Sequence, residues 1–252
     1  MRRPPRRGHA GFTLVEVAVV AGILGLLALT MTSAFEGMGQ ARERNNAQAH
    51  AEAARQALRH FLLRNKRLPC PDGSLYGDRG REAEGASACP GTLGVGWLPY
   101  ESLGLQVPVR AQRLRYGVYR GSGADLVAPV PGAVEGLDLE GLAGLSTALA
   151  KAATAAPSAA SPYYAASSAT AASTACSGAD LVNPAFVLVA PATDRDLSGG
   201  THAGFDAPNR GFAEGTDTCV AAPTRPATAA YDDVVVAESS TALLGWLTAV
   251  SR

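Results

Sequence analysis

The sequence has no surplus of positive charge, since 22 Lys and Arg residues stand against 22 Asp and Glu residues. Four of the arginines lie within residues 1–11, so the rest of the chain carries a formal charge of −4. Proteins that bind nucleic acids need clustered Lys and Arg side chains to neutralise phosphates. We therefore expect no direct nucleic acid binding by this chain.

Cysteine and histidine are scarce, with four residues of each type. No Cys-x-x-Cys pair occurs, which argues against a zinc site. The sequence also lacks Gly-x-Ser-x-Gly, His-Glu-x-x-His and a phosphate-binding loop. His50 and His60 are predicted to face different directions on one helix, because ten residues turn a helix by about 1000°. These absences argue against enzymatic activity.

A long run without any charged residue extends from Val17 to Phe35. As a helix, these 19 residues would span roughly 28 Å, close to the ~30 Å hydrocarbon core of a membrane. The arginines that precede the run favour a cytoplasmic N-terminus. We therefore predict a transmembrane segment over residues 12–35, with the remainder of the chain exported.

A single acidic residue, Glu16, directly precedes the uncharged run. A carboxylate inside a membrane helix costs about 3 kcal/mol, so it calls for a functional reason. The stretch Gly11-Phe12-Thr13-Leu14-Val15-Glu16, behind its basic leader, resembles the class III signal of type IV prepilins and type II secretion pseudopilins. A plain signal anchor would explain the arginines and the apolar run, but neither Gly11-Phe12 nor Glu16.

The resemblance implies processing and assembly. A prepilin peptidase would remove residues 1–11 by cutting between Gly11 and Phe12, and would methylate the new amino group of Phe12. Glu16 would then pair with the amino terminus of a neighbouring subunit, which offsets the desolvation of both charges. The partners implied are the peptidase, other pilin or pseudopilin subunits and the bacterial inner membrane, with a periplasmic C-terminal domain.

The apolar pattern continues beyond the uncharged run. Residues recur at alternating steps of four and three along one helix face: Ala47, Ala51, Ala54, Leu58, Phe61 and Leu62. Pro69 and Pro71 end this pattern, because proline lacks an amide donor and clashes with the preceding turn. We predict one helix over residues 12–65.

Residues 66–252 are predicted to form the exported globular domain. Apolar and branched runs predict strands at 114–119, 185–190 and 231–237, and Ser239-Ser240 precedes a predicted C-terminal helix. Between about residues 121 and 180 the pattern is diluted, with a short helix predicted over 137–152 and an Ala, Ser and Thr tract over 153–175. Such a tract buries little surface and predicts a mobile insertion.

The expected fold class is therefore α+β and pilin-like, with the long N-terminal helix packed on an antiparallel sheet. The expected function is that of a structural subunit, and the large insertion favours a minor one, in a type IV pilus or a type II secretion pseudopilus. The alternative is a membrane-anchored periplasmic enzyme or ligand-binding domain.

All four cysteines follow the predicted membrane segment, and an even number in an exported domain indicates disulfides. Three pairings are possible. We favour Cys70–Cys89 and Cys176–Cys219, because each would enclose a glycine-rich, loop-like stretch.

One segment has the spacing that begins a calcium loop. Asp194, Asp196 and Ser198 offer oxygens at alternate positions, and Gly199 follows as the turn residue. Phe205 occupies the twelfth position in place of Glu, which excludes an EF-hand. Other aspartates would have to complete a calcium site in space, the candidates being Asp206, Asp217, Asp232 and Asp233. The alternative is a plain turn, in which Asp and Ser bind their own backbone.

Overall fold

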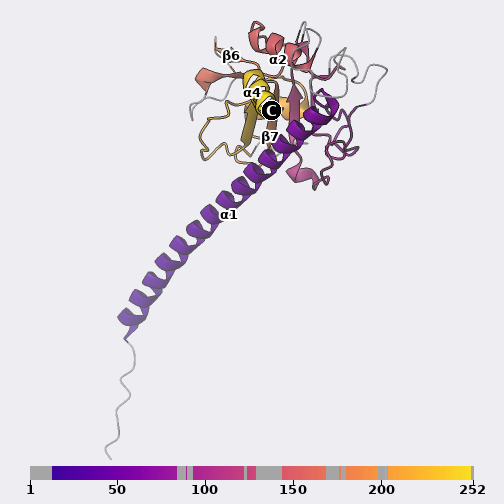
Figure 1. Cartoon of the computed structure of the whole chain (residues 1–252). Helices are drawn as coiled ribbons and strands as arrows, with labels where there is room; N and C mark the ends of the chain where they lie inside the picture. The colour runs from indigo at the N-terminus through magenta and orange to yellow at the C-terminus, as the bar shows by residue number, and fades with distance from the viewer. Residues whose placement is uncertain are drawn as a thin grey trace, which may run out of the picture. The chain divides into compact units, whose positions relative to one another are not determined.

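The computed structural model describes residues 13–83, 89, 93–121, 124–128, 144–168, 176, 180–197, 202 and 204–250, and for residues 28–36 the backbone alone. The chain divides into two compact units, Met1–Arg42 and Glu43–Arg252. The first helix, α1 (Leu14–Asn65), contributes residues to both units (Figure 1).

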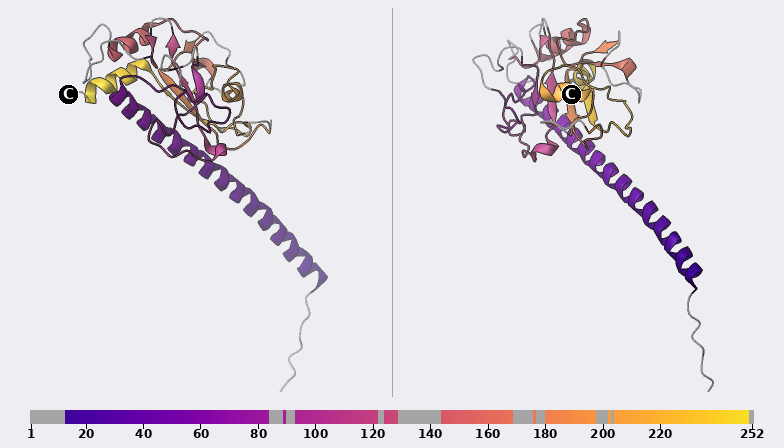
Figure 2. Two further views of the ribbon diagram at one scale, coloured as in Figure 1. Left: turned by 90° about the vertical axis from the view of Figure 1, so that its right-hand side faces the viewer. Right: turned by 180° about the vertical axis from the view of Figure 1, so that it is seen from behind.

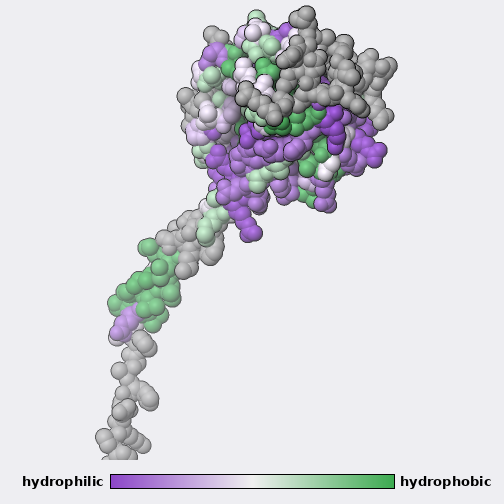
Figure 3. Space-filling model, viewed as in Figure 1, coloured by the Kyte–Doolittle hydropathy of each residue, from purple (hydrophilic) through white to green (hydrophobic). Residues whose placement is uncertain are grey.

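In the first unit, the described side chains of α1 are mostly apolar and exposed. Hydrophobic residues dominate the N-terminal part of this segment in Figure 3, and the large exposed ones in the first unit are Leu14, Val15, Val17, Val19, Val20, Ile23, Leu24, Leu26, Leu27 and Met38. The membrane span that we predicted over residues 12–35 is not confirmed: within the described residues, no helix combines the length and the apolar character needed to cross a membrane. Phe12 and the side chains of residues 28–36 lie outside that description.

In the second unit, α1 contributes the predicted apolar stripe to the core. Ala51, Leu58 and Leu62 are completely buried, and the other stripe residues are nearly so. The helix ends at Asn65, whose side-chain amide donates to the carbonyl of Phe61 at 3.0 Å. Lys66 then adopts a positive φ of 54°, and the chain leaves the helix before Pro69.

The second unit contains a four-stranded antiparallel sheet. Its strands are β1 (Val95–Trp97), β2 (Arg115–Val118), β7 (Phe186–Ala190) and β8 (Val234–Glu238). They lie in the order β1-β2-β7-β8, and every neighbouring pair is antiparallel. The prediction of helices combined with an antiparallel sheet is confirmed.

Both faces of this sheet are buried. Successive residues of a strand point to opposite sides of the sheet, so each strand contributes side chains to both cores. On β7, Phe186 and Leu188 face the core shared with α1, α2 (Leu145–Thr154) and α4 (Ser240–Val250). Val187 and Val189 face a second core that includes Phe212 of α3 (Asn209–Glu214). Burial on both sides explains why the sequence of β7 is continuously apolar.

The close packing of the second core requires a glycine in β2. A Cβ at Gly117 would lie 2.8 Å from Cζ of Phe212 and 2.9 Å from Cγ of Pro162. Gly77 is also constrained, because its φ is +67° and a Cβ there would lie 2.7 Å from the Trp97 ring.

The described part of the predicted insertion is more regular than we expected. It contains β3 (Arg120–Gly121), β4 (Ala124–Asp125), α2, β5 (Tyr164–Ala165) and the 3-10 turn η2 (Ala166–Ser168), while β6 (Leu181–Val182) follows it and pairs with β5. The helix predicted over 137–152 begins later, at Leu145, and residues 129–143 lie outside the description. Burial of apolar side chains stabilises α2: Leu145, Leu149 and Ala152 are buried, and α2 packs beside α4 (Figure 2).

The start of the last strand also differs from the sequence prediction. The last strand begins at Val234 rather than Tyr231, because backbone groups before Val234 bond outside the sheet: the Tyr231 carbonyl accepts the Thr228 amide at 2.7 Å, and the Asp232 amide donates to Asp206 at 2.9 Å. A short 3-10 turn, η1 (Arg110–Gln112), precedes β2. The helix α4 begins as predicted at the paired serines, where the Ser239 hydroxyl accepts the Ala242 amide at 3.1 Å.

Candidate functional site

Glu16 closes the first turn of α1. The backbone N–H of Thr13 donates to Oε2 of Glu16 at 2.8 Å, and the Thr13 hydroxyl donates to the same oxygen at 3.0 Å. In return, the Glu16 amide donates to the Thr13 hydroxyl oxygen at 3.3 Å. This reciprocal arrangement is a capping box, which satisfies amides that the first turn of a helix leaves unpaired.

The capping box occupies one of the two carboxylate oxygens of Glu16. Both bonds from Thr13 use Oε2, and within the described residues no hydrogen bond reaches Oε1. A carboxylate oxygen accepts more than one donor, so an ammonium group can bind Glu16 without displacing Thr13. Gly11 and Phe12, the predicted processing residues, lie outside the described residues.

The sequence contained the signal for this capping box, although our interpretation assigned Glu16 only to assembly. Thr13-x-x-Glu16 followed by an apolar run is the Ser/Thr-x-x-Glu pattern of a helix start. Glu16 therefore has a local structural role in the single chain, besides any role between chains.

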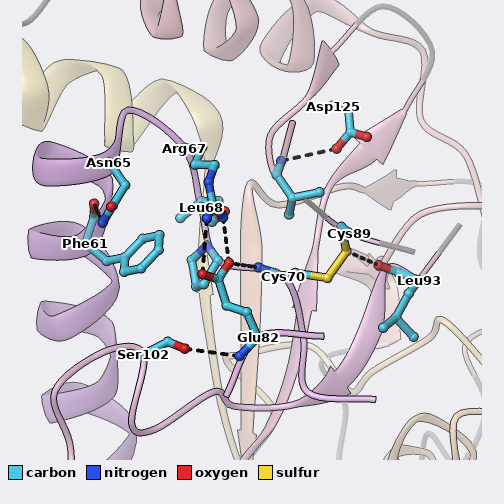
Figure 4. A network of polar contacts seen from close by, with 12 residues as sticks. Phe61, Asn65, Arg67, Leu68, Cys70, Glu82, Cys89, Leu93, Ser102 and Asp125 are labelled. Carbon is cyan, nitrogen blue, oxygen red and sulfur yellow. Dashed lines mark hydrogen bonds and ion pairs between the residues drawn. A yellow bond between two sulfur atoms is a disulfide. The ribbon is translucent and has the colours of Figure 1, made fainter. Parts of the chain in front are cut away.

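Two disulfides join the four cysteines. Cys70 bonds to Cys89 with 5.5 Å between their Cα atoms, and Cys176 bonds to Cys219 with 6.1 Å. Glu82 stabilises the loop that the Cys70–Cys89 disulfide closes. Its carboxylate accepts the Cys70 amide at 2.7 Å and two hydrogen bonds from the Arg67 guanidinium group (Figure 4). The second disulfide ties the predicted insertion to the segment before β8.

The aspartates that we predicted as calcium ligands lie in an acidic cluster. Oxygens of Asp194, Asp196 and Asp206 approach within 4.8 Å of one another, and so do oxygens of Asp206, Asp232 and Asp233. Asp206 belongs to both groups. Ser198 lies outside the described residues. Asp217, another candidate, instead forms a turn, since its Oδ1 accepts the amides of Thr218 and Cys219 at 2.7 and 3.1 Å.

The inner group of this cluster (Asp206, Asp232 and Asp233) joins three segments of the second unit. Asp206 accepts backbone N–H groups of Arg195, Asp196 and Asp232 at 2.9, 3.2 and 2.9 Å. Asp232 accepts the Thr193 amide at 3.1 Å, the Thr193 hydroxyl, and Nε of Arg195 at 2.7 Å. No pattern in the sequence predicts this meeting, because more than 20 residues separate Asp206 from Asp232.

Burial disfavours ionisation of two members of the inner group, Asp233 and Asp206. Desolvation raises the pKa of Asp233 well above its ordinary value, and the nearby charges of Asp206 and Asp232 act in the same direction. Hydrogen bonds from Asn209 and the Asp206 amide oppose this effect only in part. Desolvation also raises the pKa of Asp206, against three backbone hydrogen bonds that lower it.

A pocket of about 150 Å³ lies between α1 and the loop that precedes β2. Its lining is mostly apolar: His50, Ala53, Ala54, Tyr100, Leu105, Gln106, Pro108 and Leu114. The Tyr100 hydroxyl accepts the Leu114 amide at 2.8 Å, and burial raises the pKa of Tyr100. Tyr100 and Trp97 therefore act as packing residues, with the Trp97 indole N–H donating to the Leu75 carbonyl at 3.2 Å.

Comparison with known proteins identifies the N-terminal segment. The family model of the prokaryotic N-terminal methylation motif matches residues 6–32. No curated protein and no solved structure matches the chain. The matched residues include Gly11, Phe12 and Glu16, and the capping box of Thr13 and Glu16 lies within them. The chain thus carries the prokaryotic N-terminal methylation motif, which is the signal of type IV pilins and pseudopilins.

Proposed function

We propose that this protein is a minor structural subunit of a type IV pilus or a type II secretion pseudopilus. The observation that carries the proposal is the methylation motif, because it combines the basic leader, Gly11-Phe12 and Glu16 in front of an apolar helix. The motif favours a structural role over an enzymatic one.

Processing comes first in this mechanism. A prepilin peptidase cuts after Gly11, removes the four leader arginines and methylates the amino group of Phe12. Removal of the leader leaves a new ammonium group at Phe12, one residue before Thr13. The amide and hydroxyl of Thr13 hold Glu16 at the same end of α1. The two charged groups of the processed terminus therefore lie only four residues apart in the sequence, about one helical turn.

Assembly follows from the charge on Glu16. In an apolar surrounding, a carboxylate and an ammonium group each carry a desolvation cost that pairing offsets. A neighbouring subunit can supply the ammonium group of its own processed terminus. The exposed apolar side chains of α1 between Leu14 and Leu27 support the same mechanism, because they provide a surface that neighbouring helices or lipid can cover.

The proposed location is the bacterial inner membrane, with α1 as the anchor and the second unit in the periplasm. The leader arginines support a cytoplasmic N-terminus. The two disulfides support an oxidising compartment for the second unit. The insertion that carries α2 and β5 supports a minor subunit, and the copy number relative to sibling subunits in sheared filaments tests this assignment.

The test of processing uses co-expression of the full chain with an active or an inactivated prepilin peptidase. We expect mass spectrometry to find the loss of residues 1–11 and one added methyl group on Phe12 only with the active enzyme. An intact N-terminus with the active enzyme would refute the proposal.

The test of assembly compares Glu16→Gln with Glu43→Gln in the native host. Glutamine keeps an acceptor for Thr13 but removes the charge, so we expect Glu16→Gln to be processed and yet to enter filaments about tenfold less. Glu43 lies outside the motif, and Glu43→Gln controls for the substitution itself. Equal incorporation of both variants would contradict the charge-pairing mechanism.

A further inference from the structure

The pocket between α1 and the loop that precedes β2 has the size and the lining of a small-molecule site. Its volume is about 150 Å³, and an apolar cavity of this size can hold a single benzene ring. The described residues that line it include no Asp, Glu, Lys or Arg, so the pocket favours a neutral ligand. Most of its wall is apolar, from Ala53 and Ala54 on α1 and from Leu105, Pro108 and Leu114 on the loop.

One buried polar group of the lining has an unused hydrogen-bond donor. Tyr100 is 5% exposed, and its hydroxyl oxygen accepts the amide of Leu114, which lines the same pocket. In the part of the chain that the structure describes, no acceptor receives the hydroxyl proton itself. Burial raises the pKa of Tyr100, so the hydroxyl keeps this proton at neutral pH. Packing of the ring therefore leaves a buried donor without a partner, which is costly.

The other polar groups of the lining belong to His50 and Gln106, and both residues are exposed. The pocket thus combines an apolar wall, one buried donor and two polar side chains in contact with solvent. Small-molecule sites typically have this composition, because the apolar wall supplies affinity and a few polar groups fix the orientation of the ligand.

We propose that this pocket binds a small neutral molecule with a single apolar ring and one acceptor oxygen, to which the Tyr100 hydroxyl donates. A water molecule would satisfy the hydroxyl but would leave the apolar wall in contact with water. A ring that carries an oxygen both satisfies the donor and covers the wall. This inference goes beyond the proposed function and concerns the second unit alone, so a chain that is processed and assembled can still fail its test.

The first test uses para-fluorophenol as the probe and the full chain in detergent. For a ligand of this size in a half-open pocket, we expect a Kd of about 1 mM. The fluorine resonance of the probe should broaden with the wild type and sharpen again when excess phenol competes for the pocket. A resonance that the wild type does not broaden beyond the effect of detergent alone would overturn the proposal.

Two matched variants separate the pocket from the detergent micelle. Ala49 and Ala53 are both exposed on α1, but of the two only Ala53 lines the pocket. Ala53→Leu should fill part of the pocket and weaken binding of para-fluorophenol about tenfold, whereas Ala49→Leu should bind the probe as the wild type does. Equal broadening with both variants would show that the probe dissolves in the micelle, and would refute the proposal.

The second test isolates the Tyr100 hydroxyl. Fluorobenzene has the ring but no oxygen, so its binding measures the contribution of the apolar wall. In Tyr100→Phe, we expect the affinity for para-fluorophenol relative to that for fluorobenzene to fall about fivefold, because one hydrogen bond is lost. Binding of fluorobenzene by the variant shows that its pocket is intact, and an unchanged ratio would then overturn the role of Tyr100. If Tyr100→Phe binds neither probe, the comparison of Ala53→Leu with Ala49→Leu decides.

Discussion

Arg59 of α1 binds the buried carboxylate of Glu238 at the end of β8, 179 residues further along the chain. Nη2 of Arg59 lies 2.9 Å from Oε1 and 3.0 Å from Oε2 of Glu238, and the guanidinium group also lies 5.3 Å from the Trp246 ring centre. Glu238 is 3% exposed, so this pair ties α1 to the sheet and to α4 within the second unit.

Removal of one partner of this pair should destabilise the second unit. We expect Arg59→Met to lower the free energy of unfolding by about 3 kcal/mol, because it leaves a buried carboxylate with only Arg55 nearby, at 3.8 Å, among the described residues. The double variant Arg59→Met with Glu238→Gln should recover much of this loss. Urea denaturation measures the free energy of unfolding of both variants. A double variant that is no more stable than Arg59→Met would contradict the explanation.

The capping box predicts a local effect at the start of α1. Thr13→Val removes the hydroxyl that bonds to Glu16, so we expect the first turn to lose about 1 kcal/mol. Amide hydrogen exchange in residues 14–17 should then become about fivefold faster, while exchange in α4 stays unchanged. Thr13→Ser keeps the hydroxyl and serves as the control.

The buried aspartates predict a dependence of stability on pH. The folded-state pKa of Asp233 is raised, so the folded chain binds more protons than the unfolded chain above the unfolded pKa of about 3.9. The contribution of Asp233 to the free energy of unfolding should therefore fall as pH rises from about 4, by about 1.4 kcal/mol per pH unit until the folded-state pKa is reached.

The comparison with Asp233→Asn isolates this effect. His202 works in the opposite direction, because burial lowers its pKa and favours the folded chain as pH rises, but it is common to both proteins. We expect the wild type to lose stability relative to the variant as pH rises from about 4 to about 7. Denaturation curves with a constant difference across this range would contradict the assignment.

Two glycines predict opposite effects of the same substitution. Gly117→Ala places a Cβ against Phe212 and Pro162, so we expect a loss of about 2 kcal/mol and a midpoint lower by about 5 °C. In α4, Gly245 has no neighbouring atom within 4 Å of its would-be Cβ, so Gly245→Ala should stabilise by about 1 kcal/mol. Thermal unfolding of both variants tests the pair, and a loss at Gly245 as large as at Gly117 would contradict this explanation.

The features that the sequence predicts well are those with local causes. The stripe from Ala47 to Leu62 repeats with the period of a helix, and Pro69 marks the region where that helix has ended. The continuous apolar run at Phe186–Ala190 predicts a strand because both of its faces are buried. The motif around Glu16 is likewise contained in a few adjacent residues.

The features that the sequence does not predict depend on distant pairs. The sheet places β2 beside β7, which follows it by almost 70 residues, and no local pattern encodes that pairing. In the acidic cluster, Asp206 accepts the backbone amide of Asp232. A bond to a backbone amide requires no particular side chain at the donor residue, so the sequence shows these aspartates only as ordinary turn residues. Order in α2 depends on burial of Leu149 rather than on the composition of the surrounding tract.

The position of α4 after all the other helices and strands determines when the second unit can fold. Leu243 and Leu247 of α4 are completely buried in the core that α1 also lines, and β8 completes the sheet just before them. A nascent polypeptide therefore lacks these core side chains until residues 234–247 have been made, although α1 emerges early. The core of the second unit can therefore close only after β8 and α4 have been synthesised, and chaperones can hold the incomplete domain until then.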